Sequence, residues 1–201
     1  MRIIPCLLSA ALLLACTPPA PPVLQQATLL PDAKPIADFK LINQQGEAFT
    51  LADLKGHWTF AFFGYTHCPD VCPTSLAMLA QVVRKLAHSL EGDQLPRGLF
   101  VSVDPQRDTP EVLAKYLPYF HPDFIGATGD DRQIKALTRQ LGILYARADG
   151  GTDQDYLINH SAAIVLFDPA GEFRALFGAP HDPTKIAGDF LLIKQYYEAT
   201  H

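Results

Sequence analysis

The sequence FFGYTHCPDVCP, residues 62–73, decides the fold of this chain. An apolar segment leads into a Cys-x-x-x-Cys turn, and a helical pattern follows the turn. Residues 58–65 form an apolar and aromatic run, which is typical of a central strand buried on both faces. Residues 74–90 repeat apolar side chains at helical spacing. The sequence therefore predicts a strand, a dithiol turn and a helix in that order.

The flanking sequence alternates between strand and helix signals. Residues 39–51 alternate around Gln44-Gln45-Gly46, a hairpin signal in which the glycine supplies the positive φ. Further strands are expected at residues 99–103, 124–127, 162–167 and 172–177, and further helices from residues 108–111, over residues 131–141 and from residues 182–184. This order predicts an α/β fold, a three-layer sandwich with a mixed central sheet and an N-terminal β-hairpin extension.

Composition limits the function classes. The chain has 201 residues, of which 48% are hydrophobic, and a formal net charge of −5. These values fit one globular domain with an N-terminal appendage. Because no Lys/Arg-rich run is present in the sequence, nucleic acid is not an expected partner.

The N-terminus carries an export signal. Residues 3–15 are nearly all apolar but fall short of the roughly twenty residues that a membrane span needs, so they are typical of a signal peptide. The sequence Leu13-Leu14-Ala15-Cys16 resembles a bacterial lipobox, which implies cleavage before Cys16 and a lipid on its sulfur. The alternative is an ordinary signal peptide that contains a cysteine. Export is expected in either case.

A proline-rich segment follows the predicted cleavage site. Residues 17–35 contain six prolines, which favour extended polyproline II structure over a packed element. We therefore expect a signal peptide at residues 1–15, a tether at residues 16–35 and a folded domain at residues 36–201.

The cysteine turn has a predicted electrostatic environment. Pro73 is acceptable as a first helical residue, which would place Cys72 at the helix cap. Both thiols would then lie near the positive end of the helix dipole, where the pKa of a cysteine falls.

Three interpretations of Cys68 and Cys72 compete. A structural disulfide closing so short a loop would restrict little chain entropy. A thiol–disulfide redox pair suits the strand–Cys–helix arrangement of thioredoxin, although two intervening residues are usual there and this chain has three. A metal-binding pair would select Cu(I) or Zn(II) and would need a further ligand. Spacing alone favours redox and metal chemistry equally.

His160 is the candidate third ligand. It immediately precedes the predicted strand at residues 162–167 and follows an acidic loop at residues 148–154. Facing the cysteine turn, it would complete a Cys₂His site. His67 adjoins Cys68, but consecutive residues at a strand end point in opposite directions. The remaining histidines lie in turns, loops or chain ends: His57, His88, His121, His181 and His201.

Three segments resemble the signature blocks of the Sco/SenC family: FGYTHCPDVCPTSL, VSVDPQRDTPEVLAKY and DYLINHSAAIVLFDPAGEF. The resemblance extends over the whole domain, from about residue 36 to the C-terminus. It implies a thioredoxin-like fold and one copper ion per domain, as Cu(I) or Cu(II). The ligands that it implies are Cys68, Cys72 and His160.

The resemblance also implies a role. A membrane-tethered periplasmic metallochaperone would deliver copper to the dinuclear copper site of cytochrome c oxidase, reduce the cysteines of that site, or do both. Its expected partners are the copper-site subunit of the oxidase and other periplasmic copper chaperones or thiol reductants. The lipid on Cys16 would hold it at the membrane. The alternative is a periplasmic thiol–disulfide reductase in which Cys68 or Cys72 attacks a protein disulfide.

Two further sequence features bear on this choice. Thioredoxin-type oxidoreductases carry a cis-proline before the strand that faces their cysteines, whereas the matching place here reads Asn159-His160-Ser161, which favours metal binding. Asp104, Arg107 and Asp108 match the VDPxRDTP block of the family. We interpret this block as a strand stop and helix cap with an Arg–carboxylate contact.

Overall fold

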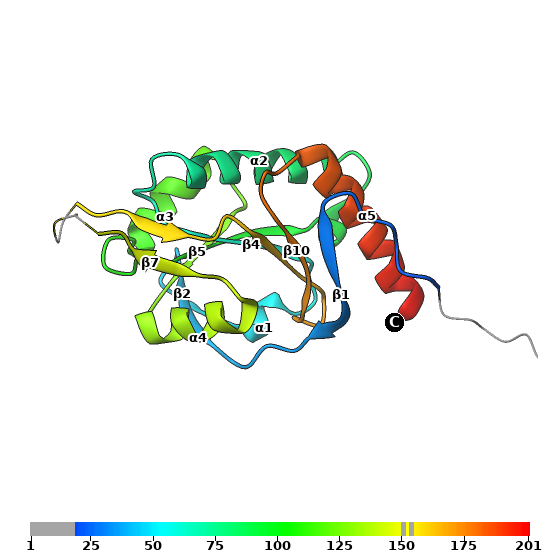
Figure 1. Cartoon of the computed structure of the whole chain (residues 1–201), viewed down its shortest axis with the longest axis horizontal. Helices are drawn as coiled ribbons and strands as arrows, with labels where there is room; N and C mark the ends of the chain where they lie inside the picture. Colours follow the sequence, from blue (N-terminus) through cyan, green and yellow to red (C-terminus); the bar gives the residue numbers. More distant parts are fainter. Residues whose placement is uncertain (1–18, 150–151, 153–154) are drawn as a thin grey trace, which may run out of the picture.

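A computed structural model describes residues 19–149, 152 and 155–201. The predicted signal peptide and Cys16 lie outside these residues, as do four positions of the predicted acidic loop. Figure 1 shows a central sheet with helices on both of its faces. This arrangement confirms the predicted three-layer α/β sandwich.

The sheet is mixed, as predicted. Its strand order is β1-β10-β9-β4-β5-β6-β2-β3, with β4, β5 and β6 parallel and the other pairs antiparallel. The bounds are β1 Ala27–Lys34, β2 Lys40–Asn43, β3 Ala48–Thr50, β4 Thr59–Gly64, β5 Arg97–Ser102, β6 Ile125–Thr128, β9 Ile164–Phe167 and β10 Phe173–Phe177. The predicted hairpin is β2–β3, and Gly46 adopts the expected positive φ of 82°.

In the described residues, five α-helices lie against the sheet. Their bounds are α1 Leu51–Leu54, α2 Val71–Leu86, α3 Pro110–Tyr116, α4 Asp131–Leu141 and α5 Pro183–Thr200, and short 3-10 helices lie at Gly92–Gln94 and Leu117–Tyr119. Figure 1 shows α2 and α5 on one face of the sheet and α1 and α4 on the other. In the part of the chain that the structure describes, no helix is both long and apolar enough to cross a membrane.

β4 is the centre of the core. All six of its residues are buried, as its apolar sequence predicted. Phe60 contacts Phe190 of α5, with ring centroids 5.4 Å apart, and Phe62 contacts Phe100 of β5 at 6.3 Å. Full burial of each such side chain contributes about 1.5–3 kcal/mol to folding. The cysteine turn is therefore attached to the end of a strand that is buried along its whole length.

The predicted tether at residues 16–35 needs correction in its second half. Ala27–Lys34 forms β1, an edge strand that pairs with β10. Pro31 lies where the register shifts between Leu29 and Lys34. A proline can occupy an edge strand or a bulge because no ladder hydrogen bond from its nitrogen is required there. The prediction of a tether from proline content is therefore wrong for residues 27–34.

A buried carboxylate anchors the start of β1. Asp189 of α5 is fully buried and accepts hydrogen bonds from the backbone N–H groups of Gln25, Gln26 and Ala27 at 2.9, 2.7 and 2.7 Å. The Gln26 side chain accepts a further bond from the backbone of Asp182 at 3.1 Å. The domain thus begins near residue 25.

We predict that Asp189→Ala destabilises the domain by about 2–4 kcal/mol, because three backbone donors lose their buried acceptor. The measurement is the midpoint of urea-induced unfolding. The matched control is Asp32→Ala, which removes an exposed carboxylate from β1 itself and should leave the midpoint unchanged. Equal midpoints for the wild type and Asp189→Ala would show that the anchor contributes nothing to stability.

Candidate metal centre

The structure brings Cys68, Cys72 and His160 together. Their Sγ, Sγ and imidazole nitrogen atoms all lie within 4.8 Å of one another, and Cys72 Sγ is 3.2 Å from His160 Nε2. Cys68 and Cys72 are free thiols. In the described residues, no other group of three His, Cys, Asp or Glu side chains is arranged to hold a metal ion.

Helix α2 begins earlier than the sequence predicted. Val71 is its first residue and Asp70 its N-cap, so Pro73 is the third helical residue and Cys72 the second. The prediction that Cys72 is the cap is wrong, as is the predicted helix end at residue 90. Proline is tolerated at the third position because the first four N–H groups of a helix have no intrahelical acceptor. Cys72 is therefore fixed by helical geometry rather than by a flexible turn.

The thiol of Cys72 occupies the space that a side chain on Gly64 would need. A Cβ added to Gly64, the last residue of β4, would lie 2.5 Å from Cys72 Sγ. The backbone N–H of Tyr65 donates to the same sulfur at 3.5 Å. A residue without a side chain at the end of β4 thus lets the first turn of α2 pack directly on the sheet.

Burial determines the protonation of Cys72. Its side chain is fully buried, and this desolvation raises its pKa above the ordinary thiol value. The prediction that the helix dipole lowers the pKa of both thiols is therefore wrong for Cys72. The desolvation penalty on a buried thiolate exceeds the stabilisation that one helix terminus supplies. Without a metal, Cys72 is a neutral thiol.

His160 is presented by a two-stranded ribbon that the sequence did not predict. It is the last residue of β8, Ile158–His160, which pairs with β7, Tyr145–Arg147. The expectation that His160 precedes a buried strand is confirmed only in part, because β9 begins at Ile164 and His160 ends a separate strand. Figure 1 shows this ribbon extending from the end of the domain.

The imidazole of His160 is oriented for binding. Its Nδ1 lies 3.2 Å from the carbonyl oxygen of Ser161. Because a carbonyl only accepts, Nδ1 carries the proton and the lone pair of Nε2 is directed toward Cys72. The rings of Phe62 and Tyr65 contact the imidazole edge-on, each at 5.9 Å. Burial lowers the pKa of His160, so the ring is neutral at neutral pH.

The 104–108 segment supports the cysteine turn. Asp108 is fully buried and accepts hydrogen bonds from the Thr66 backbone at 2.9 Å, the Thr66 hydroxyl at 2.6 Å and the Ser102 hydroxyl at 2.6 Å. Thr66 lies two residues before Cys68. We expected the helix cap in the block that holds Asp104, Arg107 and Asp108. The observed N-cap of α3 is Thr109, whose side chain accepts from Val112 N at 3.4 Å, and Asp108 instead holds the turn in place.

The same segment supports the strand that carries His160. The predicted Arg–carboxylate contact is present, with Arg107 Nε 2.5 Å from Asp104 Oδ2. The Tyr156 hydroxyl donates to Asp104 at 2.6 Å, and the Arg107 guanidinium lies 3.6 Å from the Tyr156 ring centroid. The backbone of Ile158, in β8, donates to the Tyr65 hydroxyl at 3.1 Å. Sequence reasoning missed both tyrosines, because nothing in their local pattern marks them.

The other histidines do not join the cluster. His67 is more than half exposed, and its Nδ1 lies 3.9 Å from Asp108, which agrees with the prediction that it points away from Cys68. His57 contacts Arg97, and His121 contacts Asp123. The donor set is therefore two sulfurs and one imidazole, which suits a soft metal ion such as Cu(I) or Zn(II).

Comparison with known proteins identifies relatives of this chain. Residues 28–194 match the sequence model of the SCO1/SenC family. The chain is 41% identical over 178 residues to an SCO2-like protein of Rickettsia felis, covering 87% of this chain and 85% of the relative. It is similar to Arabidopsis thaliana ScoI with copper bound: 37% identity, TM-score 0.73, covering 80% of this chain and 98% of that one. Bradyrhizobium japonicum ScoI with copper bound gives 38% identity and a TM-score of 0.67, covering 81% and 99%.

We predict that Cys72 resists alkylation in the metal-free chain. Its sulfur is buried and its pKa is raised, so the reactive thiolate is scarce at pH 8 and its amount should still be rising above pH 9. The measurement is the rate of iodoacetamide labelling at each cysteine by peptide mass spectrometry. Cys68 is partly exposed and should react first. Equal labelling rates at both sulfurs would contradict this prediction.

We also predict that Gly64→Ala destabilises the domain by about 1–3 kcal/mol, because the added methyl group displaces the Cys72 thiol or the strand end. Urea-induced unfolding measures the effect. Gly178→Ala is the matched control, since a Cβ at Gly178 meets nothing within 4 Å. If Gly64→Ala is as stable as the control, the contact between the Cys72 thiol and the end of β4 does not exclude a side chain at position 64.

Proposed function

This chain belongs to the SCO1/SenC family, and from this premise we propose that it is a copper metallochaperone. One copper ion would be held by Cys68, Cys72 and His160 and passed to the dinuclear copper site of cytochrome c oxidase. The observation that carries the proposal is the convergence of these three donor groups, drawn from a turn, a helix and a separate ribbon.

The donor chemistry supports Cu(I) as the bound form. Two thiolates and a neutral imidazole nitrogen are soft or borderline ligands, which match Cu(I) well. Binding would require Cys72 to release its proton, and the positive ion would compensate for the burial of the thiolate. Cu(II) would recruit additional oxygen or nitrogen ligands.

The exposure of the three groups suggests an order of release. Cys68 and His160 are partly exposed, whereas Cys72 is buried. A partner thiol would therefore approach on the side of Cys68 and His160. A bond between copper and the partner sulfur would form as the Cys68–copper bond breaks, and the proton of the partner thiol would pass to the released Cys68. Cys72 would be the last ligand to leave.

We further propose that the chain is exported and held at a membrane by a lipid on Cys16, facing the periplasm. The support is the lipobox-like sequence at residues 13–16. Because Asp189 anchors the backbone at residues 25–27, the free tether would be shorter than the proline-rich segment. At about 3.1 Å per residue, it would reach about 30 Å from Cys16.

The alternative function, a thiol–disulfide reductase, requires an attacking thiolate. Cys72 is poorly suited to this role because its sulfur is buried and its pKa is raised. Cys68 would have to attack, with Cys72 resolving the mixed disulfide. This function predicts turnover of a protein disulfide that survives in His160→Ala and is lost in either cysteine variant.

A Cu(I) titration of the full chain, in competition with a chromophoric chelator under anaerobic reducing conditions, tests the proposal. We predict that the wild type binds one equivalent of Cu(I). The affinity should be at least about 100-fold lower in Cys68→Ser and in His160→Ala, because loss of a ligand should cost at least as much affinity as loss of a supporting residue. His67→Ala is the matched control and should bind as the wild type does. Wild-type affinity in both Cys68→Ser and His160→Ala would overturn the proposal.

A further inference from the structure

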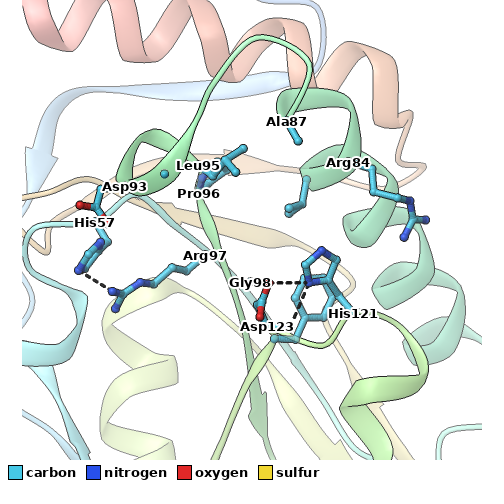
Figure 2. Close-up of a pocket in the computed structure, with 13 residues that line it drawn as sticks. His57, Arg84, Ala87, Asp93, Leu95, Pro96, Arg97, Gly98, His121 and Asp123 are labelled. Carbon is cyan, nitrogen blue, oxygen red and sulfur yellow. Dashed lines mark hydrogen bonds and ion pairs between the residues drawn. The ribbon is translucent and has the colours of Figure 1, made fainter.

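A pocket lies at the opposite end of the sheet from the cysteine turn and the metal centre. It opens at the amino ends of β4 and β5, whereas the metal centre lies beyond the carboxyl end of β4, a strand length of about 20 Å away. Its volume is about 330 Å³. Figure 2 shows the side chain of Arg97 extending toward His57, with His121 and Asp123 lying together apart from that pair.

The interior of this pocket is apolar. Gly98 of β5 has no side chain, and the ring of Phe124 lies so close that a Cβ there would meet it at 2.4 Å. The His121 ring stacks on Phe124, with centroids 5.1 Å apart. The other apolar walls are Val83, Leu95 and Pro96. These surfaces would favour a compact apolar group over bulk water.

Arg97 places a positive charge beside this apolar interior. Its side chain is partly buried, and its hydrogen bond is to His57 Nε2 at 2.6 Å. Because a guanidinium only donates, His57 Nε2 must be the acceptor of this hydrogen bond. Among the described residues, no carboxylate lies within ion-pair distance of Arg97. Within these residues, its charge therefore has no acidic counterpart.

Arg97 is only partly buried, and its donors that His57 does not engage remain accessible to solvent or to a ligand. Charged groups withdrawn from water are normally paired with an opposite charge. The chain contains 21 acidic residues, so an acidic partner would have been readily available. The two at the pocket rim, Asp93 and Asp123, are exposed, and Asp123, whose side chain is 88% exposed, lies near His121 instead. Neither carboxylate forms an ion pair with Arg97.

We propose that this pocket binds a small organic monocarboxylate. Its carboxylate would accept hydrogen bonds from the free donors of Arg97, and its apolar body would lie against Phe124 and Leu95. An inorganic anion would pair with the Arg97 charge but leave the apolar walls of the pocket exposed to water. A neutral apolar molecule would cover the apolar walls but would not form an ion pair with the guanidinium. The site is separate from the metal centre and does not depend on the function proposed for it.

Titration of the full, ¹⁵N-labelled chain with benzoate, followed by the amide signals of Gly98 and Leu95, tests this site. Benzyl alcohol and inorganic phosphate are the comparison probes, each lacking one of the two required features. We expect saturable benzoate binding in the wild type and binding at least about ten-fold weaker in Arg97→Gln, because a charge-assisted hydrogen bond is lost. Arg132→Gln is the matched control, because it removes the same charge from the exposed face of α4.

A second variant separates loss of the site from loss of the fold. Ala87→Phe adds a ring at the pocket rim without removing a contact, and it should also weaken benzoate binding about ten-fold. Retained Cu(I) binding and native amide signals show that each variant is folded. The proposal is overturned if benzoate does not saturate the wild type, if both pocket variants bind it as the wild type does, or if benzyl alcohol or phosphate binds equally well.

Discussion

The contact on which the metal centre depends is the packing of the Cys72 sulfur against the backbone of Gly64. Glycine at the end of the fully buried strand β4 lets the first turn of α2 approach the sheet as closely as a sulfur atom allows. Any larger residue would push the helix outward and separate Cys72 from His160. The same close approach removes Cys72 from water and raises its pKa. Geometry and protonation at this sulfur therefore have one physical origin.

The 104–108 segment connects the two halves of the centre. Asp108 holds Thr66 and thereby the turn that carries Cys68, while Asp104 and Arg107 hold Tyr156 near the strand that carries His160. Buried charged groups are costly unless they are paired and hydrogen-bonded. Here their partners lie on separate elements of the site. The 104–108 segment resembles a simple strand stop in sequence. In the structure it connects the turn that carries Cys68 with the strand that carries His160.

Several expectations failed for related reasons. The proline-rich composition of residues 17–35 predicts a tether, but Ala27–Lys34, which holds only Pro31, forms a strand because it lies at a sheet edge that tolerates proline. The pKa of Cys72 was expected to fall because the helix terminus was visible in the sequence and the burial was not. The β7–β8 ribbon escaped detection because its strands have three residues each, too short for an alternating pattern to be recognised.

The sequence by itself determined the order of most strands and helices (β1, β7 and β8 excepted), the buried central strand, the position of the two cysteines at its end and the β2–β3 hairpin. These follow from local periodicity and turn chemistry, which act over a few residues. It also singled out His160 as a candidate, but could not place it. Only the tertiary structure decided that its Nε2 lies 3.2 Å from Cys72 Sγ. It also decided that Asp108 binds Thr66 and Asp104 binds Tyr156, and that Arg97 forms no ion pair with a carboxylate of the described residues. Those outcomes depend on contacts between residues far apart in the chain, and burial, rather than local sequence, sets their energies.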